Sequence, residues 1–263
     1  MDKQRIVYYD NELTDDFAGN NIKQKKLGPR FKYIHRNIFW RFGSWFAYYF
    51  IAWPILGLIG SIKFGVRVKG RKNLKSLRKT GFFVYGNHSC WGDSFFTSTK
   101  IVRPKRAYII ANPDAVSLPF LKNFVQMIGA TPLPDSYQRT REFLDCIDYR
   151  MKKKQVIIIF PEAHIWPYYT GLRNFSSSSF FYPVKMNKPV IALAGTWRAP
   201  KKAGKKPKIT LHISAPFYPD ANLDRKEAEQ KLRDQVYAFL KDKTSSKDNY
   251  EYIKYVKKDK ASV

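Results

Sequence analysis

The sequence has little cysteine. Its 263 residues include only Cys90 and Cys146, which provide no disulfide framework and no cluster with the spacing of a metal site. Such sparing use of cysteine favours a reducing compartment and a protein without a bound metal. The first twenty residues are polar and acidic, so we expect no signal peptide and a catalytic part in the cytoplasm.

Two common site signatures are also missing. The chain contains no Gly-x-Ser-x-Gly sequence, which serine hydrolases use to expose their nucleophile, and no glycine-rich loop that would cradle a phosphate. Four consecutive serines, Ser176 to Ser179, therefore indicate a helix start or a polar loop rather than a nucleophile.

Acidic residues are scarce relative to basic ones. The 48 Lys and Arg residues outnumber the 21 Asp and Glu residues, which gives a formal net charge of +27. A charge of this size attracts polyanions, which means nucleic acid or the anionic surface of a membrane.

A long uncharged stretch runs from Phe42 to Ile62 and is rich in aromatic residues. Its length would allow a membrane span. However, Pro54 lies near its middle and basic residues flank both ends, which suits a segment that enters the interface and returns. We predict two short helices, roughly 33–52 and 54–64, in the membrane interface. A helical hairpin on a soluble domain and a single span are the alternatives.

Two buried strands are each followed by polar residues. The apolar run Phe82–Tyr85 precedes His88 and Asp93, and Val156–Phe160 precedes Pro161, Glu162 and His164. If both runs are parallel strands of one sheet, both polar clusters emerge at the same edge, where open α/β sheets keep their sites.

The spacing of His88 and Asp93 constrains how they meet. Five residues on a regular helix rotate a side chain by about 140°, so the two groups would point apart if both were helical. We expect His88 in the turn and Asp93 in the first helical turn, where the carboxylate orients the imidazole as a general base. The alternative is a histidine-containing loop in which Asp93 serves only as a helix cap.

Strands and helices alternate along the rest of the chain, which predicts an α/β fold with a mostly parallel central sheet flanked by helices, preceded by a membrane-associated two-helix motif. We divide the chain into a polar and basic N-terminal arm (1–32), the interfacial motif (33–64), the α/β domain (65–243) and a basic, solvated tail (244–263). The arm is expected to be extended or partly disordered. The aromatic segment Ile165–Tyr169 is predicted either to line a groove or to pack on the core.

Three motifs together resemble the glycerolipid acyltransferases of the lysophosphatidate acyltransferase type. They are Asn87-His88-x4-Asp93, Phe160-Pro161-Glu162 and Lys188-Pro189-Val190-Ile191, and the resemblance covers roughly residues 65–215. It implies that His88 is the base and Asp93 its orienting partner, and that the Phe160 motif helps to bind the acceptor. The donor would be acyl-CoA or acyl carrier protein, with no other cofactor.

The chain also departs from this family. Members usually continue the Phe-Pro-Glu motif as Glu-Gly-Thr-Arg, but here Glu162 is followed by Ala163-His164-Ile165, and the segment Gly129–Asp135 lacks the usual arginine. Arginine can bind a phosphate through two hydrogen bonds at once, so the missing arginines count against lysophosphatidate in particular as the acceptor. The candidate substitutes for these arginines are Arg139, Arg141, Arg173 and Lys185. The expected binding residues are Asn87, Phe160, Pro161, Glu162, His164 and Arg173.

The predicted function is acyl transfer to a hydroxyl of a lysophospholipid or a glycerol-phosphate-type acceptor. The protein would lie on the cytoplasmic face of the membrane, peripheral or monotopic. Its expected partners are membrane lipids and, where it is the donor carrier, acyl carrier protein, with no nucleic acid. Two alternatives remain: a lipid esterase or thioesterase, and a basic module that binds nucleic acid. Cys90, beside His88, is an alternative nucleophile, although a small buried residue is the ordinary role for a free cysteine.

Overall fold

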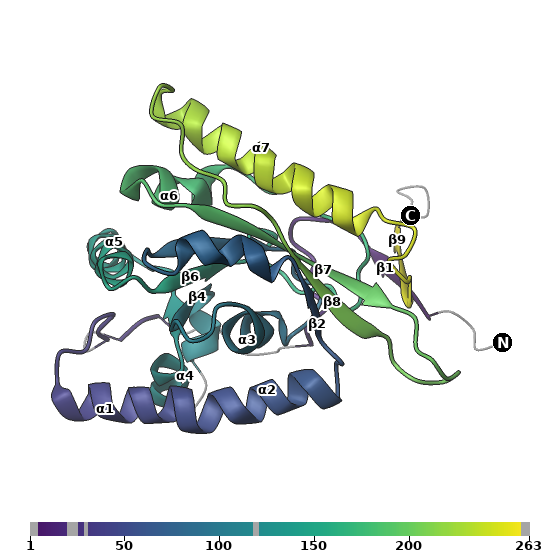
Figure 1. Cartoon of the computed structure of the whole chain (residues 1–263), viewed down its shortest axis with the longest axis horizontal. Helices are drawn as coiled ribbons and strands as arrows, with labels where there is room; N and C mark the ends of the chain where they lie inside the picture. The colour runs from purple at the N-terminus through teal and green to yellow at the C-terminus, as the bar shows by residue number, and fades with distance from the viewer. Residues whose placement is uncertain (1–4, 20–25, 29–30, 118–120, 259–263) are drawn as a thin grey trace.

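The centre of the protein is a seven-stranded sheet, seen in a computed structural model that describes residues 5–19, 26–28, 31–117 and 121–258 (Figure 1). The strand order is β2-β8-β7-β3-β6-β4-β5. Only the β7–β8 pair is antiparallel among these neighbours, which confirms the predicted mostly parallel α/β sheet. The strands are β2 (Arg67–Lys69), β3 (Phe82–Gly86), β4 (Ala107–Ala111), β5 (Ala130–Pro132), β6 (Val156–Ile159), β7 (Val190–Arg198) and β8 (Lys208–Ile213).

Helices cover both faces of this sheet. One face packs against α5 (Tyr137–Lys152), α6 (Phe181–Met186) and α7 (Arg225–Thr244), and the other against α2 (Trp53–Ile62) and α3 (Asp93–Phe96). The helix α4 (Lys122–Met127) contacts both α1 (Ile38–Phe46) and β5. Shorter 3₁₀ segments are η2 (Arg71–Leu77), η4 (Pro113–Val116) and η5 (Ser178–Phe180), and the π-helical η3 (Thr97–Ile101) extends α3.

The central strands are buried on both faces, as their continuous apolar sequences predict. Every residue of β3 and β6 is buried. Their register pairs Phe83 with Ile157 and Tyr85 with Ile159, so the two strands end level with each other. The polar residues that follow them therefore start from one edge of the sheet.

The apolar N-terminal segment forms one continuous helix rather than the two we predicted. It comprises α1 (Ile38–Phe46), a π-helical turn η1 (Ala47–Ala52) and α2, and spans Ile38–Ile62. The expected break at Pro54 is wrong because the π turn bonds the amide of Trp53 to the carbonyl of Tyr48. Pro54 then falls at the start of α2, where a missing amide proton costs little. Among the described residues, this is the one helix long and apolar enough to cross a membrane.

The two ends of the chain also differ from the prediction. Within the described residues, β1 (Arg5–Tyr9) pairs in parallel with β9 (Ile253–Lys257), so the tail is not simply solvated. Figure 1 shows this two-stranded sheet beside the end of β7 and β8. The part of the predicted arm at 20–25 lies outside the described residues.

Trp166 holds the two ends in place. Its ring is fully buried and contacts the rings of Tyr9, Phe17, Tyr169 and Tyr255. Its indole N–H donates to the carbonyl of Asp15 at 2.8 Å. The aromatic segment after Glu162 is thus a packing centre for chain segments that are distant in sequence.

Trp166→Ala should therefore lower the free energy of unfolding by about 3–5 kcal/mol, because it leaves a large cavity under both termini. Urea unfolding followed by circular dichroism measures this. Trp91→Ala, which removes a half-exposed indole, is the control and should cost about 1 kcal/mol or less. Equal losses in the two variants would contradict the role given to Trp166.

Candidate active site

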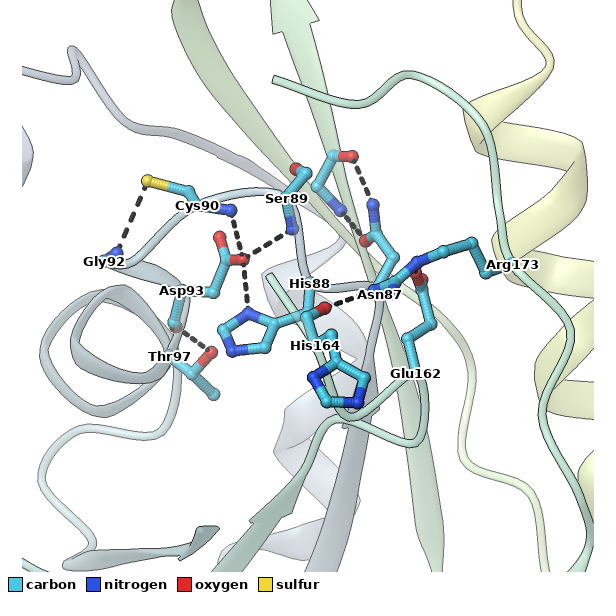
Figure 2. A network of polar contacts seen from close by, with 11 residues as sticks. Asn87, His88, Ser89, Cys90, Gly92, Asp93, Thr97, Glu162, His164 and Arg173 are labelled. Atoms are coloured by element: carbon cyan, nitrogen blue, oxygen red, sulfur yellow. Dashed lines mark hydrogen bonds and ion pairs between the residues drawn. The ribbon is translucent and has the colours of Figure 1, made fainter. Parts of the chain in front are cut away.

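His88 and Asp93 meet in space, as their spacing predicts. His88 lies in the loop that follows β3, and Asp93 is the first residue of α3. The imidazole Nδ1 lies 3.1 Å from Asp93 Oδ2, a contact that Figure 2 shows as a dashed line. Both side chains are largely buried, so this pair lies in a shielded part of the protein.

The carboxylate of Asp93 is held by the backbone as well as by His88. The amides of Ser89 and Cys90 donate to the same Oδ2 atom at 3.0 and 2.8 Å. Burial raises the pKa of Asp93, and the hydrogen bonds from His88 and from these two amides oppose that rise. This oxygen accepts the His88 contact in addition to the two amide bonds, which requires the proton of the neutral imidazole to be on Nδ1.

The ring of His88 is fixed on its face too. It stacks on Phe160 with ring centroids 4.3 Å apart and planes inclined by 17°. Its Nε2 makes no hydrogen bond within the part of the chain that the structure describes. With Nδ1 committed to Asp93, the Nε2 lone pair is the group that can accept a proton from a substrate.

Asn87 joins the turn after β3 to the neighbouring strand. Its side-chain amide donates to the carbonyl of Gly195 at 3.0 Å, and its side-chain oxygen accepts from the Gly195 amide at 2.7 Å. Because both polar ends are used in this clamp, Asn87 positions the His88 loop in this structure. The predicted contact of Asn87 with substrate stays a prediction.

The two predicted polar clusters lie side by side at the sheet edge. The amide of Trp166 donates to the carbonyl of His88 at 3.2 Å, and the amide of Tyr168 donates to the carbonyl of Ser89 at 2.9 Å. The loop after β6 therefore fixes the loop after β3 through main-chain bonds.

Glu162 forms an ion pair that the sequence did not predict. Its Oε2 lies 2.7 Å from Nε of Arg173, and both side chains are almost completely buried. Burial raises the pKa of Glu162, and the adjacent guanidinium opposes that rise. Arg173 also donates to the carbonyl of His164 and lies over the Trp166 ring. Substrate contact by either member of the pair would require this segment to move.

His164 is covered by the N-terminal arm. Its Nδ1 lies 3.7 Å from Asp16 Oδ2, and the neighbouring Phe17 amide donates to the carbonyl of Ile165 at 3.3 Å. Asp16 therefore reaches the edge of the candidate site from the other end of the chain. No sequence signal marked it, because the arm carries no regular period.

The cations considered for phosphate recognition are dispersed. Arg139 is engaged with Glu142 and with the carbonyls of Gly28 and Phe31, and Arg173 is buried with Glu162. Arg141 and Lys185 are exposed, and Lys185 lies over the ring of Phe181. Neither of them forms a hydrogen bond, ion pair or ring contact with His88 within the described part of the chain.

Lys63 is a cation near the site that the sequence reasoning missed. It follows α2 directly, and its ammonium lies 5.6 Å from the ring of Trp91 in the His88–Asp93 loop. The only signal for it was its position at the end of the uncharged stretch.

Cys90 is placed as a small core residue. It is buried, its Sγ accepts from the Gly92 amide at 3.4 Å, and burial raises the pKa of its thiol. A thiol held in this neutral form is a poor nucleophile. Among the described residues, no group of three or more His, Cys, Asp or Glu side chains is placed to hold a metal ion.

Glu162→Ala should destabilise the fold by about 3–5 kcal/mol, because it leaves the Arg173 guanidinium buried and unpaired. Replacing both partners, as Glu162→Leu with Arg173→Met, should recover most of this loss. Asp148→Ala, which breaks a largely exposed ion pair with Lys152, should cost about 0–1 kcal/mol. Urea unfolding compares the variants. A Glu162→Ala cost as small as that of Asp148→Ala would contradict a structural role for the pair.

Comparison with known proteins agrees with this geometry. The family model named Acyltransferase matches residues 65–195, which include both motifs at the sheet edge. The fold is similar to the crystal structure of the 1-acyl-sn-glycerophosphate (LPA) acyltransferase PlsC from Thermotoga maritima, with a TM-score of 0.56 and 17% sequence identity over 79% of this chain and 88% of that one. No curated protein matches the chain in sequence. Residues 65–195 form a domain of the acyltransferase family, and the fold is similar to that of PlsC.

Proposed function

We propose that the protein transfers a fatty acyl group from an acyl thioester to a hydroxyl of a glycerolipid acceptor. The observation that carries this proposal is the His88–Asp93 pair, with Nδ1 bonded to the carboxylate at 3.1 Å and Nε2 left open. An imidazole held in this way is a general base with a fixed tautomer.

The chemistry then follows in one exchange. The acceptor oxygen attacks the thioester carbonyl carbon as His88 Nε2 removes the hydroxyl proton. The carbon–sulfur bond breaks, the new ester forms, and the departing thiolate takes the proton from the imidazolium. Asp93 stabilises the positive charge on the ring during this transfer. The high pKa of the Cys90 thiol supports direct transfer over a covalent enzyme intermediate.

The acceptor is proposed to carry a phosphate, as a lysophospholipid or glycerol phosphate does. The arginines that usually serve this purpose in the family are missing from their motifs. Lys63 supports the proposal, because it is exposed and lies beside Trp91 in the catalytic loop. A lysine binds phosphate as a point charge rather than in two places. The donor, acyl-CoA or acyl carrier protein, is proposed on the family resemblance alone.

We also propose that the helix Ile38–Ile62 seats the protein on the cytoplasmic face of the membrane. Figure 1 shows α1 and α2 along one border of the molecule. Phe39, Phe46 and Phe50 are among its exposed apolar side chains. In the most apolar 18 residues of this helix, only 22% are buried against the rest of the protein. A continuous apolar surface of this kind marks a membrane or protein contact. The net charge of +27 supports attraction to anionic lipid.

His88→Ala and Asp93→Asn test the mechanism. With labelled acyl thioester and acceptors offered with and without a phosphate, His88→Ala should lower the transfer rate by about 10²–10⁴-fold, because proton removal is lost. Asp93→Asn should also reduce it severely, because the amide no longer fixes the tautomer. Asp148→Asn is the control and should match the wild type. Undiminished transfer in both site variants would exclude this mechanism, and equal use of phosphate-free acceptors would overturn the acceptor class.

The triple substitution Phe39→Ser, Phe46→Ser and Phe50→Ser tests the membrane contact. We expect it to move the protein from sedimented anionic vesicles to the supernatant, because it removes apolar area that enters the interface. The control replaces three exposed apolar residues outside the helix Ile38–Ile62 and the adjoining α4, namely Tyr8, Tyr137 and Tyr218, by Ser and should remain with the vesicles. The same partition for both triples would refute the seating.

A further inference from the structure

A basic cavity lies away from the catalytic edge. It has a volume of about 460 Å³ and is lined by α1 and by residues of β4, β5 and α5. Two of its residues, Arg106 and Gln155, come directly before β4 and β6. They are thus at the amino ends of parallel strands, whereas His88 and Glu162 follow the carboxyl ends. This cavity, named here the α1 cavity, is separate from the candidate active site.

The lining of the α1 cavity carries positive charge that nothing nearby neutralises. Arg41, Arg106, Arg150 and Lys153 line it, and no Asp or Glu does. None of these four cations forms an ion pair with a carboxylate within the described residues. The nearby carboxylate of Asp148 pairs with Lys152, which does not line the cavity. Four cations around one cavity favour an anionic occupant.

Two of the arginines are rigidly placed. Arg106 Nη2 donates to Ser44 Oγ and to the carbonyl of Met127, both at 2.5 Å. The Arg150 guanidinium lies 4.0 Å from the centroid of the Tyr108 ring. A guanidinium that is already held in position loses little entropy when it binds an anion.

Several buried polar atoms of the lining have no hydrogen-bond partner among the residues that the structure describes. They include three donors: the hydroxyl of Tyr33, whose residue is only 6% exposed, and the Nε atoms of Arg106 and Arg150. They also include one acceptor, Gln155 Oε1. Buried donors without acceptors are costly, so such a set indicates a bound group. Donors around an acceptor suit a phosphate that carries a hydroxyl or ammonium substituent.

The α1 cavity also adjoins the proposed membrane surface. Ile38, Phe42 and Trp45 line it, and each is substantially exposed on α1. If α1 lies in the interface, these residues place the cavity next to the lipid headgroups. This step rests on the proposed seating, whereas the anion chemistry of the cavity does not.

We propose that the α1 cavity binds the phosphate headgroup of an anionic lipid, at a site distinct from the one that binds the acceptor. Phosphate contacts from Arg106, Arg150 and Lys153 would fix the orientation of α1 on the membrane. A free phosphate has the same core chemistry, and the experiment below separates the two sources.

The test is calorimetric titration of the full-length protein with inorganic phosphate and with monomeric dihexanoyl phosphatidylglycerol. Arg150→Gln and Lys153→Gln should each weaken binding of the short-chain lipid about tenfold or more. Lys152→Gln is the matched control, since it removes the same charge from an adjacent exposed residue that does not line the cavity. It should bind as the wild type does. If Arg150→Gln fails to fold, the comparison of Lys153→Gln with Lys152→Gln still decides.

Each other outcome has a defined meaning. Equal weakening by Lys152→Gln and Lys153→Gln would show diffuse attraction and overturn the site. No weakening in either lining variant would overturn it as well. Binding of inorganic phosphate but not of the lipid, lost in the lining variants only, would overturn the headgroup and leave a free anion as the ligand. His88→Ala should bind like the wild type, which keeps this result independent of the proposed catalysis.

Discussion

One carboxylate oxygen organises the candidate active site. Asp93 Oδ2 accepts hydrogen bonds from His88 Nδ1 and from the amides of Ser89 and Cys90. These bonds bend the chain after β3 into a tight loop, set the tautomer of the imidazole and leave its Nε2 open. The same Asp93 carboxylate therefore shapes the loop after β3 and orients the His88 ring.

The segment after β6 supports that loop from the outside. The amides of Trp166 and Tyr168 bond the carbonyls of His88 and Ser89, and the buried Glu162–Arg173 pair anchors the segment itself. The ring of Trp166 also packs against Tyr9 in β1 and Tyr255 in β9, which links the N-terminal and C-terminal strands to this segment. Residues that were expected to hold substrate thus help, in this structure, to position the His88 loop.

The sequence predicted what depends on local pattern. The buried strands β3 and β6 follow from the continuous apolar runs Phe82–Tyr85 and Val156–Phe160. Two sets of contacts between residues outside a shared helix or strand leave no periodic pattern in the sequence and could not be predicted. Glu162 and Arg173 are eleven residues apart without a regular element between them, and β1 pairs with β9 across almost the whole chain. The π-helical turn before Pro54 could not be predicted either. It consists of a shift in backbone hydrogen bonding, which no pattern of side chains marks in the sequence.

The state of the His88 imidazole tests the central claim most directly. Nitrogen-15 NMR of protein labelled at histidine, recorded where the ring is neutral, distinguishes the Nδ1–H tautomer from the Nε2–H tautomer. The account predicts Nδ1–H for His88 in the wild type and loss of that preference in Asp93→Asn. An Nε2–H tautomer in the wild type would contradict it, because the nitrogen that faces the acceptor would then have no lone pair to take the proton.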